Sequence, residues 1–343
     1  MAKDEETVKL DIKDRKILRE LDMNARMNIK ALARRVGLSR QVVLYRLDKM
    51  RKNNLITAIT TFDSAVVGKN WFRVVFQLQK ITPKKKQEFI NYFIHHQHTC
   101  WLGEVGGNWD FVLNLITDDQ FAFNQEFEKI LGDWGQFVKK YEILTYINVR
   151  DQARLYLLPE YQTETSEFFH AMKCNPELRL DGLDKKLIKL LTKDAWLSAS
   201  ELGNKLGVNY KTIQERMKRM EKTSLILGYR LSLRPRHIGF EKNMVFLGIN
   251  SYDPKLEAQL YEFLKHPNVT FLVKHLGIWR IGFECEFASM REFQDFLIEL
   301  RTRFGDIIST YETFPIFHSH LINYFPDGAL AIDDQQSKQK PKY

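Results

Sequence analysis

The chain carries one sequence pattern twice, at a separation of about 170 residues, and this repeat limits the possible folds more than any other feature. The repeat is visible in pairs of identical residues: Gly37 and Gly207, Met50 and Met220, Trp109 and Trp279, and Tyr141 and Tyr311. One residue is inserted in the second copy, so that Gly68 corresponds to Gly239 before the register of 170 returns. A repeat of this length indicates two tandem units with the same fold.

Each copy begins with a pattern of three short helices. In the first copy, Ile17, Leu18 and Leu21 lie on one helical face, and Asn28 is a suitable N-cap for a second helix that ends at Gly37. Ser39 caps a third helix, and residues 55–62 alternate as in a strand. Three helices, a glycine turn and a wing made of a strand pair predict a winged helix-turn-helix.

The second part of each copy predicts the order β-α-β-β-α-β. In the first copy the predicted elements are 71–79, 83–93, the hairpin 99–117, 119–131 and 140–149. In the second copy they are 243–250, 254–264, the hairpin 269–286, 290–304 and 309–317. This order is that of the ferredoxin-like sandwich. The predicted fold class is therefore α+β, with two tandem units of winged helix-turn-helix followed by βαββαβ.

The repeat also predicts the domain boundaries. We expect helix-turn-helix domains at 1–62 and 180–235, βαββαβ domains at 63–158 and 236–326, a linker at 159–179 and a disordered tail at 327–343. The first four residues are also expected to be disordered. Since the two units share one chain, we expect their βαββαβ domains to pair within it as a pseudo-dimer, with further self-association an open question.

Basic charge is concentrated in the two predicted helical modules. The whole chain has a net charge of +9, whereas residues 1–60 carry +7 and residues 180–236 carry another +7. The rest of the chain is therefore mildly acidic. Two basic modules on an acidic body are typical of a nucleic-acid-binding protein, because phosphates attract lysine and arginine. The sequence predicts double-stranded DNA as the partner.

The first sixty residues resemble the N-terminal domain of the leucine-responsive/AsnC (Lrp/AsnC, or feast/famine) transcription regulators. The resemblance is carried by the sequences LDIKDRKILREL and LARRVGLSRQVVLYRL. It covers both halves of the chain and is stronger in the first copy. An ordinary member of that family has one unit and dimerises, so this chain resembles two fused members, of a kind expected in archaea. The resemblance implies DNA binding by helix-turn-helix domains and effector binding by the βαββαβ domains.

The outward face of each third helix is the predicted DNA-reading surface, because that helix enters the major groove in this motif. Arginine can bind guanine and glutamine can bind adenine through two hydrogen bonds, so Arg40 and Gln41 are the leading candidates. The candidates of the first copy are Arg34, Arg35, Ser39, Arg40, Gln41, Leu44, Tyr45, Lys49, Arg51 and Lys52. Those of the second copy are Asn209, Tyr210, Lys211, Gln214 and Lys218, with Glu215 at the position of Tyr45. The unlike faces predict unlike half-sites.

The hairpin of the first copy contains a candidate effector loop, Gly107, Asn108, Trp109 and Asp110. It resembles the family loop that usually contains Gly-Asp-Tyr-Asp, near which the family binds amino acids. Asp110 could accept a ligand ammonium, but local backbone amides could satisfy it equally well. The second copy has Arg280 in place of the aspartate. At most one acidic site for a small amino-acid effector is therefore expected per chain.

Other functional classes find little support in the sequence. His95, His96, His98 and Cys100 are close in sequence, but adjacent helical positions diverge, so no metal site is expected. Three cysteines far apart and the absence of a long apolar run indicate a reducing cytoplasm and no membrane span. No catalytic motif or cofactor-binding motif is present, and no cofactor is expected.

Two alternatives to a sequence-specific regulator remain open. Siroheme decarboxylases resemble the same two-domain unit and work as pairs of unlike copies, which a fusion would mimic. Such an enzyme needs cationic and histidine side chains around a tetrapyrrole cleft. The other alternative is a DNA-architectural protein with little sequence preference. We expect the regulator and no enzyme, because an enzyme has no need of two basic helical modules.

Overall fold

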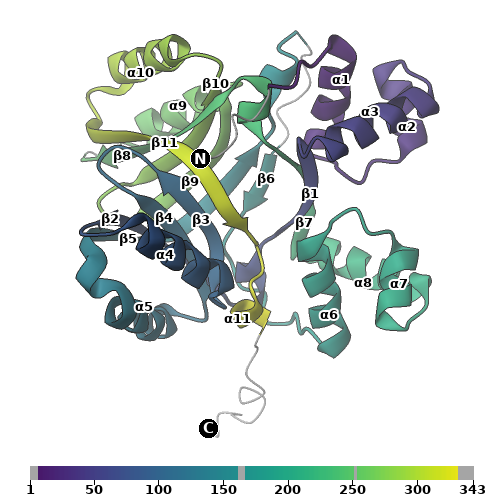
Figure 1. The fold of residues 1–343 in the computed structure, drawn as a ribbon, viewed down its shortest axis with the longest axis horizontal. Helices are drawn as coiled ribbons and strands as arrows, with labels where there is room; N and C mark the ends of the chain where they lie inside the picture. The colour runs from purple at the N-terminus through teal and green to yellow at the C-terminus, as the bar shows by residue number, and fades with distance from the viewer. Residues whose placement is uncertain (1–6, 161–166, 251–252, 331–343) are drawn as a thin grey trace, which may run out of the picture.

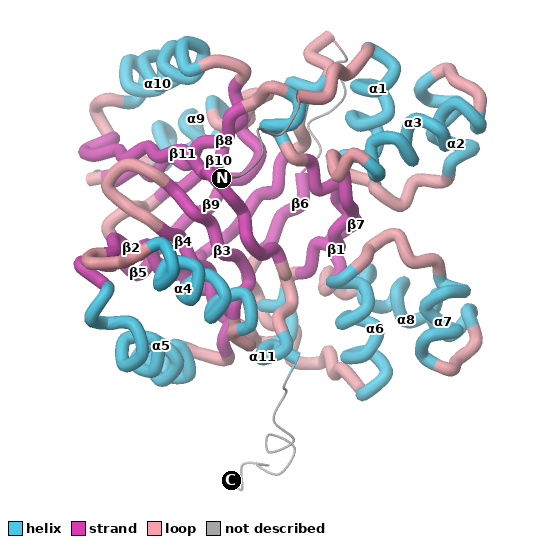
Figure 2. The backbone as a smooth tube through the Cα atoms, viewed as in Figure 1, coloured by secondary structure: helices cyan, strands magenta, loops and turns pink. Residues whose placement is uncertain are grey.

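The computed structural model describes residues 7–160, 167–250 and 253–330. Two helical heads lie on one side of the molecule and a strand-rich body lies on the other (Figure 1). The strands gather in the middle of the body, and helices cover its outside (Figure 2). The order of the elements confirms the predicted α+β fold of two tandem units.

The first head is a helix-turn-helix whose helix ends are fixed by capping side chains. Asp11 forms a capping box with Asp14, and Asn28 and Ser39 cap the next two helices. Gly37 ends the second helix at a φ of 69°, a left-handed conformation that favours glycine. The helices of this head are α1 Ile12–Asp22, α2 Ile29–Val36 and α3 Arg40–Lys52.

The second head repeats this construction. Asp181 and Ser198 begin its first two helices with capping boxes, and Asn209 caps the third. Gly207 has the same φ of 69° as Gly37. The helices are α6 Gly182–Lys193, α7 Ala199–Leu206 and α8 Tyr210–Lys222. The local signals for capping and turning are thus the same in both copies.

Each head contributes one wing strand, and the two wing strands pair with each other. β1 Ile56–Phe62 runs antiparallel to β7 Ile226–Leu233. The prediction of a strand pair inside each head is therefore wrong. A lone strand leaves its backbone groups unpaired, and here the strand of the other head satisfies them. The shared wing sheet joins the two heads.

The body contains the two predicted βαββαβ units. The first consists of β2 Asn70–Leu78, α4 Pro83–His95, β3 Thr99–Val105, β4 Phe111–Thr117, α5 Gln120–Trp134 and β5 Val138–Gln152. The second consists of β8 Glu241–Ile249, α9 Pro254–Phe263, β9 Val269–Leu276, β10 Ile281–Phe287, α10 Met290–Phe304 and β11 Ile308–Ile322. Both have the same strand order, β5-β2-β4-β3 and β11-β8-β10-β9.

The two sheets join at both edges and close into an antiparallel ring. β3 pairs with β11 and β9 pairs with β5, while β5 also pairs with β2. Side chains alternate across the ring, as in β2, where Phe72, Val74 and Phe76 face the helices and Val75 faces the interior cluster. Because the ring closes, the edge strands of each βαββαβ sheet pair with edge strands of the other sheet.

Two segments are more ordered than the sequence predicts. The expected linker 159–179 contains strand β6 Glu167–His170, which pairs with β5 at Val149–Gln152. The expected disordered tail begins with a short helix, α11 Asp327–Leu330, in which Ala329 and Leu330 are buried. These predictions rested on polar composition and overlooked the few apolar side chains that anchor each segment. Residues 1–6, 161–166 and 331–343 lie outside the described residues.

Candidate DNA-binding surface and the cavity behind it

The third helix of the first head presents the face that the sequence predicts. Val43, Leu47 and Met50 are buried in the head. All five candidates on the opposite face are exposed: Arg40, Gln41, Leu44, Tyr45 and Lys49. Ser39 lies at the helix start, where its hydroxyl accepts the amide N–H of Val42 at 3.3 Å. The helix therefore offers cationic, amide and aromatic groups to a partner without disturbing its own core.

The third helix of the second head has the same division. Ile213, Met217 and Met220 are buried. The exposed face consists of Tyr210, Lys211, Gln214, Glu215 and Lys218. Asn209 caps this helix, with its side-chain oxygen accepting the amide N–H of Lys211 at 2.9 Å. The two exposed faces differ in charge, since an acidic residue stands here where the first helix has Tyr45.

An arginine on each third helix locks that helix to the first helix of its head. Arg46 donates from Nη1 to the carboxylates of Asp11 and Asp14, at 2.7–2.9 Å. Arg216 makes the same contacts in the second head, at 2.7 Å to each carboxylate partner. The amide of Asp14 and the guanidinium of Arg46 lower the pKa of Asp11. This clamping role was not predicted from the sequence.

The candidates for phosphate contacts differ in how far they are available. Arg34 is exposed on α2, whereas Arg35 forms an ion pair with Glu20 at 2.9 Å. Lys52 forms an exposed ion pair with Asp48 at 2.7 Å. Such exposed pairs are weak and can be exchanged for a phosphate.

Arg51 is the exception among these candidates. Its guanidinium stacks on the indole ring of Trp196 in the other head, 3.7 Å from the ring centroid. Burial in this contact lowers the pKa of Arg51. Arg51 thus contacts the other head, and its phosphate contact stays a prediction.

Further contacts fix one head against the other. Arg26 Nη1 donates to the backbone oxygens of Ala195 and Leu197 at 2.7 and 2.8 Å. In return, Trp196 Nε1 donates to the Ala25 oxygen at 2.9 Å. Ala25, Ala195 and the wing residue Ala58 form a small buried cluster at this contact. Direct packing between the two heads thus sets the separation of their third helices. The sequence pattern of one copy alone could not predict this packing.

The candidate effector loop is tied into the body. The indole of Trp109 is buried against Trp279, and its Nε1 donates to Glu312 at 2.6 Å. Gly107, at a φ of 84°, and Asn108 are exposed in the turn. Asp110 Oδ2 accepts the amide N–H of Leu78 at 2.7 Å. A local backbone amide therefore uses one oxygen of this carboxylate.

The histidine-rich segment at residues 95–100 does not converge on one point. His95 and His98 contact the backbone oxygens of Asn91 and Ile116, each at 2.8 Å. His96 lies 3.5 Å from Glu126, and Cys100 is buried. In the part of the chain that the structure describes, no three His, Cys, Asp or Glu side chains are grouped as metal ligands. Over the same residues, no helix is both long and apolar enough to cross a bilayer.

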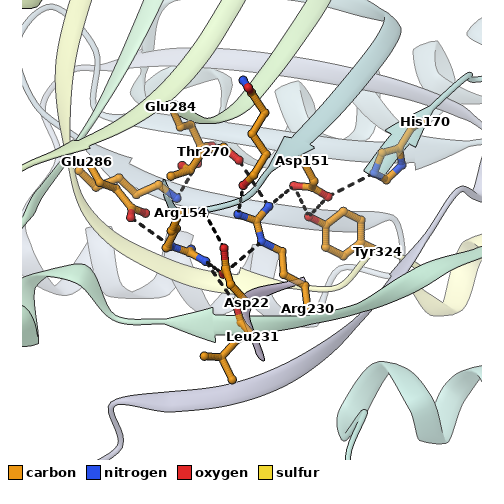
Figure 3. A network of polar contacts seen from close by, with 12 residues as sticks. Asp22, Asp151, Arg154, His170, Arg230, Leu231, Thr270, Glu284, Glu286 and Tyr324 are labelled. Carbon is orange, nitrogen blue, oxygen red and sulfur yellow. Dashed lines mark hydrogen bonds and ion pairs between the residues drawn. The ribbon is translucent and has the colours of Figure 1, made fainter. Parts of the chain in front are cut away.

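A buried polar network joins the heads to the body (Figure 3). Arg154 lies between two carboxylates, with Nη1 2.6 Å from Asp22 and Nε 3.1 Å from Glu286. Arg230 Nη1 lies 2.8 Å from Asp151. Burial opposes the charge of Arg154, but Glu286 and Asp22 hold its pKa well above the usual value. None of the residues of this network was predicted as a site from the sequence.

The second half of this network surrounds the Asp151 carboxylate (Figure 3). Tyr324 donates to it at 3.2 Å, and the His170 ring nitrogen lies 3.3 Å away. Although burial alone would raise the pKa of Asp151, Arg230 and His170 keep it below its usual value. The carboxylate is therefore charged, and it binds together β5, β6, the wing and the end of the chain's last long strand.

A cavity of about 470 Å³ lies between the wing sheet and the antiparallel ring of strands in the body. Its walls include Thr57 and Ile59 of one wing strand, Ser232 of the other, and the end of β11. The cationic and histidine side chains on its walls are Arg154, Arg230, Arg234, Arg236, Lys242, His237, His318 and His320. The acidic ones are Asp151 and Glu284. None of these residues was predicted as a site residue from the sequence.

The heads match known DNA-binding domains. A model of the winged helix-turn-helix DNA-binding family matches residues 10–57, and a model of the AsnC-type helix-turn-helix domain matches residues 180–221. The AsnC-type match thus falls on the second copy, although the sequence resemblance was expected to be stronger in the first.

Two curated relatives extend the comparison. The chain is 25% identical over 134 residues to an uncharacterised helix-turn-helix transcriptional regulator of Pyrococcus horikoshii, covering 39% of this chain and 84% of that one. It is 30% identical over 98 residues to the transcriptional regulator Ptr1 of Methanocaldococcus jannaschii, covering 29% and 66%.

The siroheme decarboxylase NirDL is similar over nearly the whole chain. Its crystal structure has a TM-score of 0.57 and 13% identity, covering 93% of this chain and 96% of that one. At this identity the likeness concerns the fold alone. The matched heads and the two relatives make this chain similar to DNA-binding regulators of the Lrp/AsnC type, and it carries the two-domain unit twice.

Proposed function

We propose that this DNA-binding regulator reads two unlike half-sites at a fixed separation. The observation that carries the proposal is the pair of exposed third helices, held in place by head-to-head packing through Arg51 and Trp196. In a helix-turn-helix, side chains near the start of this helix meet base edges in the major groove. The internal pairing of the two units would do here what dimer pairing does for an ordinary single-unit regulator.

The roles of the side chains follow from their chemistry. Arg40 and Gln41 lie in the first turn of α3, where arginine suits guanine and glutamine suits adenine. Tyr210 and Lys211 are their counterparts on α8, and Gln214 lies on the same exposed face, but Glu215 opposes the phosphate field beside them. The second half-site should therefore contribute less binding free energy. Arg34, Arg35 and Lys52 supply phosphate contacts, which set position rather than sequence.

Affinity measured against salt concentration, on a selected site and on random DNA, tests this assignment. Arg40→Ala or Gln41→Ala should cost about 1–3 kcal/mol on the selected site, with little loss on random DNA. Lys52→Ala should weaken both DNAs equally and lower the salt slope by about 1. Lys211→Ala and Gln214→Ala should cost less than Arg40→Ala. Equal losses on both DNAs for Arg40 and Gln41 variants would favour the architectural alternative instead.

An amino-acid effector is proposed for the loop that contains Asp110. One of its carboxylate oxygens accepts the Leu78 amide, and a ligand ammonium would use the other oxygen. The counterpart Arg280 cannot take that role, so one site per chain is expected. The test is whether L-amino acids raise the melting temperature, and whether Asp110→Asn abolishes the rise while Arg280→Gln does not. No rise with any amino acid removes the effector role.

A tetrapyrrole enzyme is the second candidate function. The observation in its favour is the cavity, whose walls combine five Arg or Lys side chains with three histidines. A structure of NirDL holds an iron-uroporphyrin III analogue. We rank this function below the regulator because it leaves the two basic helices without a purpose. Incubation with siroheme tests it: a shifted absorbance band and loss of carboxylate groups from the pigment would establish the enzyme.

A further inference from the structure

The two halves have equivalent positions between the wing sheet and the body, and in the described residues a strand fills only the first of them. In the first half, β6 pairs with β5 at Val149–Gln152. It also approaches the wing, where Phe168 contacts Gly228 of β7. In the register of 170, the counterpart of Val149–Gln152 is 319–322 of β11. The filled position in the first half can therefore be compared with its counterpart at 319–322 in the second half.

The matching position is open and forms the cavity. The pairing of β11 with β8 ends at Pro315, and within the described ranges no strand continues on that side. Ser319 and Ile322 line the cavity. Ile322 is 37% exposed, whereas its counterpart Gln152, covered by β6, is 6% exposed. The cavity is thus the space that a second copy of β6 would occupy.

The cavity wall carries five Arg or Lys side chains against two carboxylates, Asp151 and Glu284, and some of the cations have partners that do not line it. Arg236 lines the cavity, while its partner Glu241, at 3.0 Å, does not. His320 likewise lines it, in front of Glu104 at 3.2 Å.

Two further arginines repeat this orientation. Arg154 faces the cavity while both of its carboxylate partners lie behind it, and Arg234 is exposed at the rim. The electrostatic potential inside the cavity is therefore positive, and it favours an anion over a cation or a neutral molecule.

Aromatic side chains complete the wall. The first unit contributes Trp71 and Trp101 to the wall, and the second unit contributes Phe271, Phe317 and Tyr324. A volume of about 470 Å³ lies within the range of small-molecule sites. Flat apolar walls with cations at the rim suit a ligand that has an apolar body and an acidic group.

We propose that this cavity binds one small organic carboxylate per chain, with its acidic group at Arg234 and Arg236 and its apolar body between the tryptophans. Because the walls include both wing strands, a bound ligand would connect β11 to the wing as β6 does in the other half. Ligand binding would then stabilise one orientation of the heads. This last step rests on the proposed DNA-binding function; the binding step does not.

Phenylacetate, 3-phenylpropionate and 2-oxoglutarate serve as carboxylate probes, and 2-phenylethanol serves as the uncharged comparison. Titration calorimetry on the full chain measures binding, and tryptophan fluorescence reports contact with Trp71 and Trp101. We expect a phenyl carboxylate to bind and 2-phenylethanol to bind weakly. Arg234→Gln with Arg236→Gln should weaken the carboxylate by roughly 10- to 100-fold, the loss expected for charge-assisted hydrogen bonds.

Two more variants test the location. Ser319→Phe places an aromatic ring where a second β6 would lie, so it should block binding while leaving the melting temperature intact. Lys265→Gln, in an exposed ion pair at the end of α9, removes a charge far from the cavity and should leave binding unchanged. Carboxylate binding that survives Ser319→Phe, or binding of none of the three probes, overturns the proposal.

The connection to DNA is measured separately. A phenyl carboxylate should change the affinity for the selected DNA site in the parent chain but not in the Ser319→Phe variant. If the ligand binds and no DNA is bound specifically, the ligand site stands and the proposed regulator function fails. If siroheme binds and excludes the small carboxylates at equal concentration, the second candidate function replaces this proposal.

Discussion

The two heads meet the body through junctions of opposite character, although both arise from the same repeated sequence. At the first junction, the buried ion triad is Asp22, Arg154 and Glu286. In the register of 170, the counterparts of these residues are Thr192, Tyr324 and Ile116. The second junction instead packs Phe325 and Ala329 with the buried face of α6 in one apolar cluster. Apolar packing occurs at both junctions, but only the first contains this buried ion triad.

This difference shows what fusion allows that dimerisation does not. In a symmetric homodimer both junctions must be identical, because one sequence forms both. Here each junction has its own residues, so each can be strengthened or changed separately. A buried triad is sensitive to the loss of any one member, whereas an apolar cluster loses stability gradually as atoms are removed. The first head should therefore be the one whose attachment fails abruptly.

Removal of the guanidinium at the first junction should have the largest effect. Arg154→Met leaves Asp22 and Glu286 buried without their shared cation, and breaking a buried ion pair in this way costs about 3–5 kcal/mol. We expect the free energy of unfolding in urea to fall by that amount. Native-state hydrogen exchange should show α1 losing protection before α6.

The matched control removes the whole charge set. Asp22→Asn, Arg154→Met and Glu286→Gln together leave no charge in the triad, so this triple variant should be more stable than Arg154→Met alone. If the triple variant is less stable than the single variant, the junction depends on polar packing rather than on charge balance. The distinction between an ionic and an apolar junction would then be lost.

A conservative truncation at the second junction should have a smaller effect. Phe325 packs edge-on against Phe62 at 5.6 Å, and Phe325→Leu removes part of that contact without stranding a charge. We expect a loss of about 1–2 kcal/mol in the same urea experiment. The loss should be independent of salt, because no ion pair is broken. A loss as large as that of Arg154→Met would show that the two junctions fail alike.

Local features of this fold could be predicted from the sequence, because their causes lie within a few residues. Gly37 and Gly207 end helices in the left-handed conformation, and Ser39 and Asn209 begin the next ones. The buried faces of the third helices follow from helical periodicity alone. For the same reason the exposed faces of α3 and α8 were predicted correctly.

Features that depend on which distant segments meet could not be predicted in this way. Nothing in the β1 sequence states that its partner is β7 rather than a second strand of the same head. Arg154 and Arg230 look like ordinary charged residues until the fold buries them. One usable signal did exist: at these positions the two copies differ sharply, as with Glu286 and Ile116, and such differences mark sites where the halves have diverged.

Loosening the contact between the heads should alter DNA spacing more than stability. Trp196→Ala removes the stacking of Arg51 and the hydrogen bond to Ala25, a contact worth about 0.5–2 kcal/mol. We expect the parent chain to prefer one half-site spacing and the variant to tolerate several. Competition among DNAs with spacers of different length measures this. Lys173→Ala, at an exposed position of the segment that joins the two units, is the control. An unchanged preference for one half-site spacing in Trp196→Ala would mean that the wing sheet alone sets the spacing.

The smallest effect concerns the seams where the two sheets join, which carry ion pairs of reversed sign. At one seam Lys86 pairs with Glu104 at 2.6 Å, and at the other the counterparts Glu257 and Lys274 pair with the charges exchanged. His320 and Lys86 lower the pKa of Glu104 to about 2. The additional histidine makes the first seam different from the second.

A lowered carboxyl pKa stabilises the fold above the pKa of the unfolded chain, and that stability disappears as the pH falls through the folded value. Wild-type protein should therefore lose stability between about pH 4.5 and pH 2 more steeply than Glu104→Gln. At neutral pH the variant should be less stable by about 1 kcal/mol, because exposed Lys86 is partly screened by solvent. Lys274→Gln at the other seam removes the cation instead, and its acid profile should stay close to that of the wild type in this range. Urea unfolding at a series of pH values measures all three proteins. Parallel curves for wild type and Glu104→Gln would show that the lowered pKa of Glu104 does not stabilise the fold.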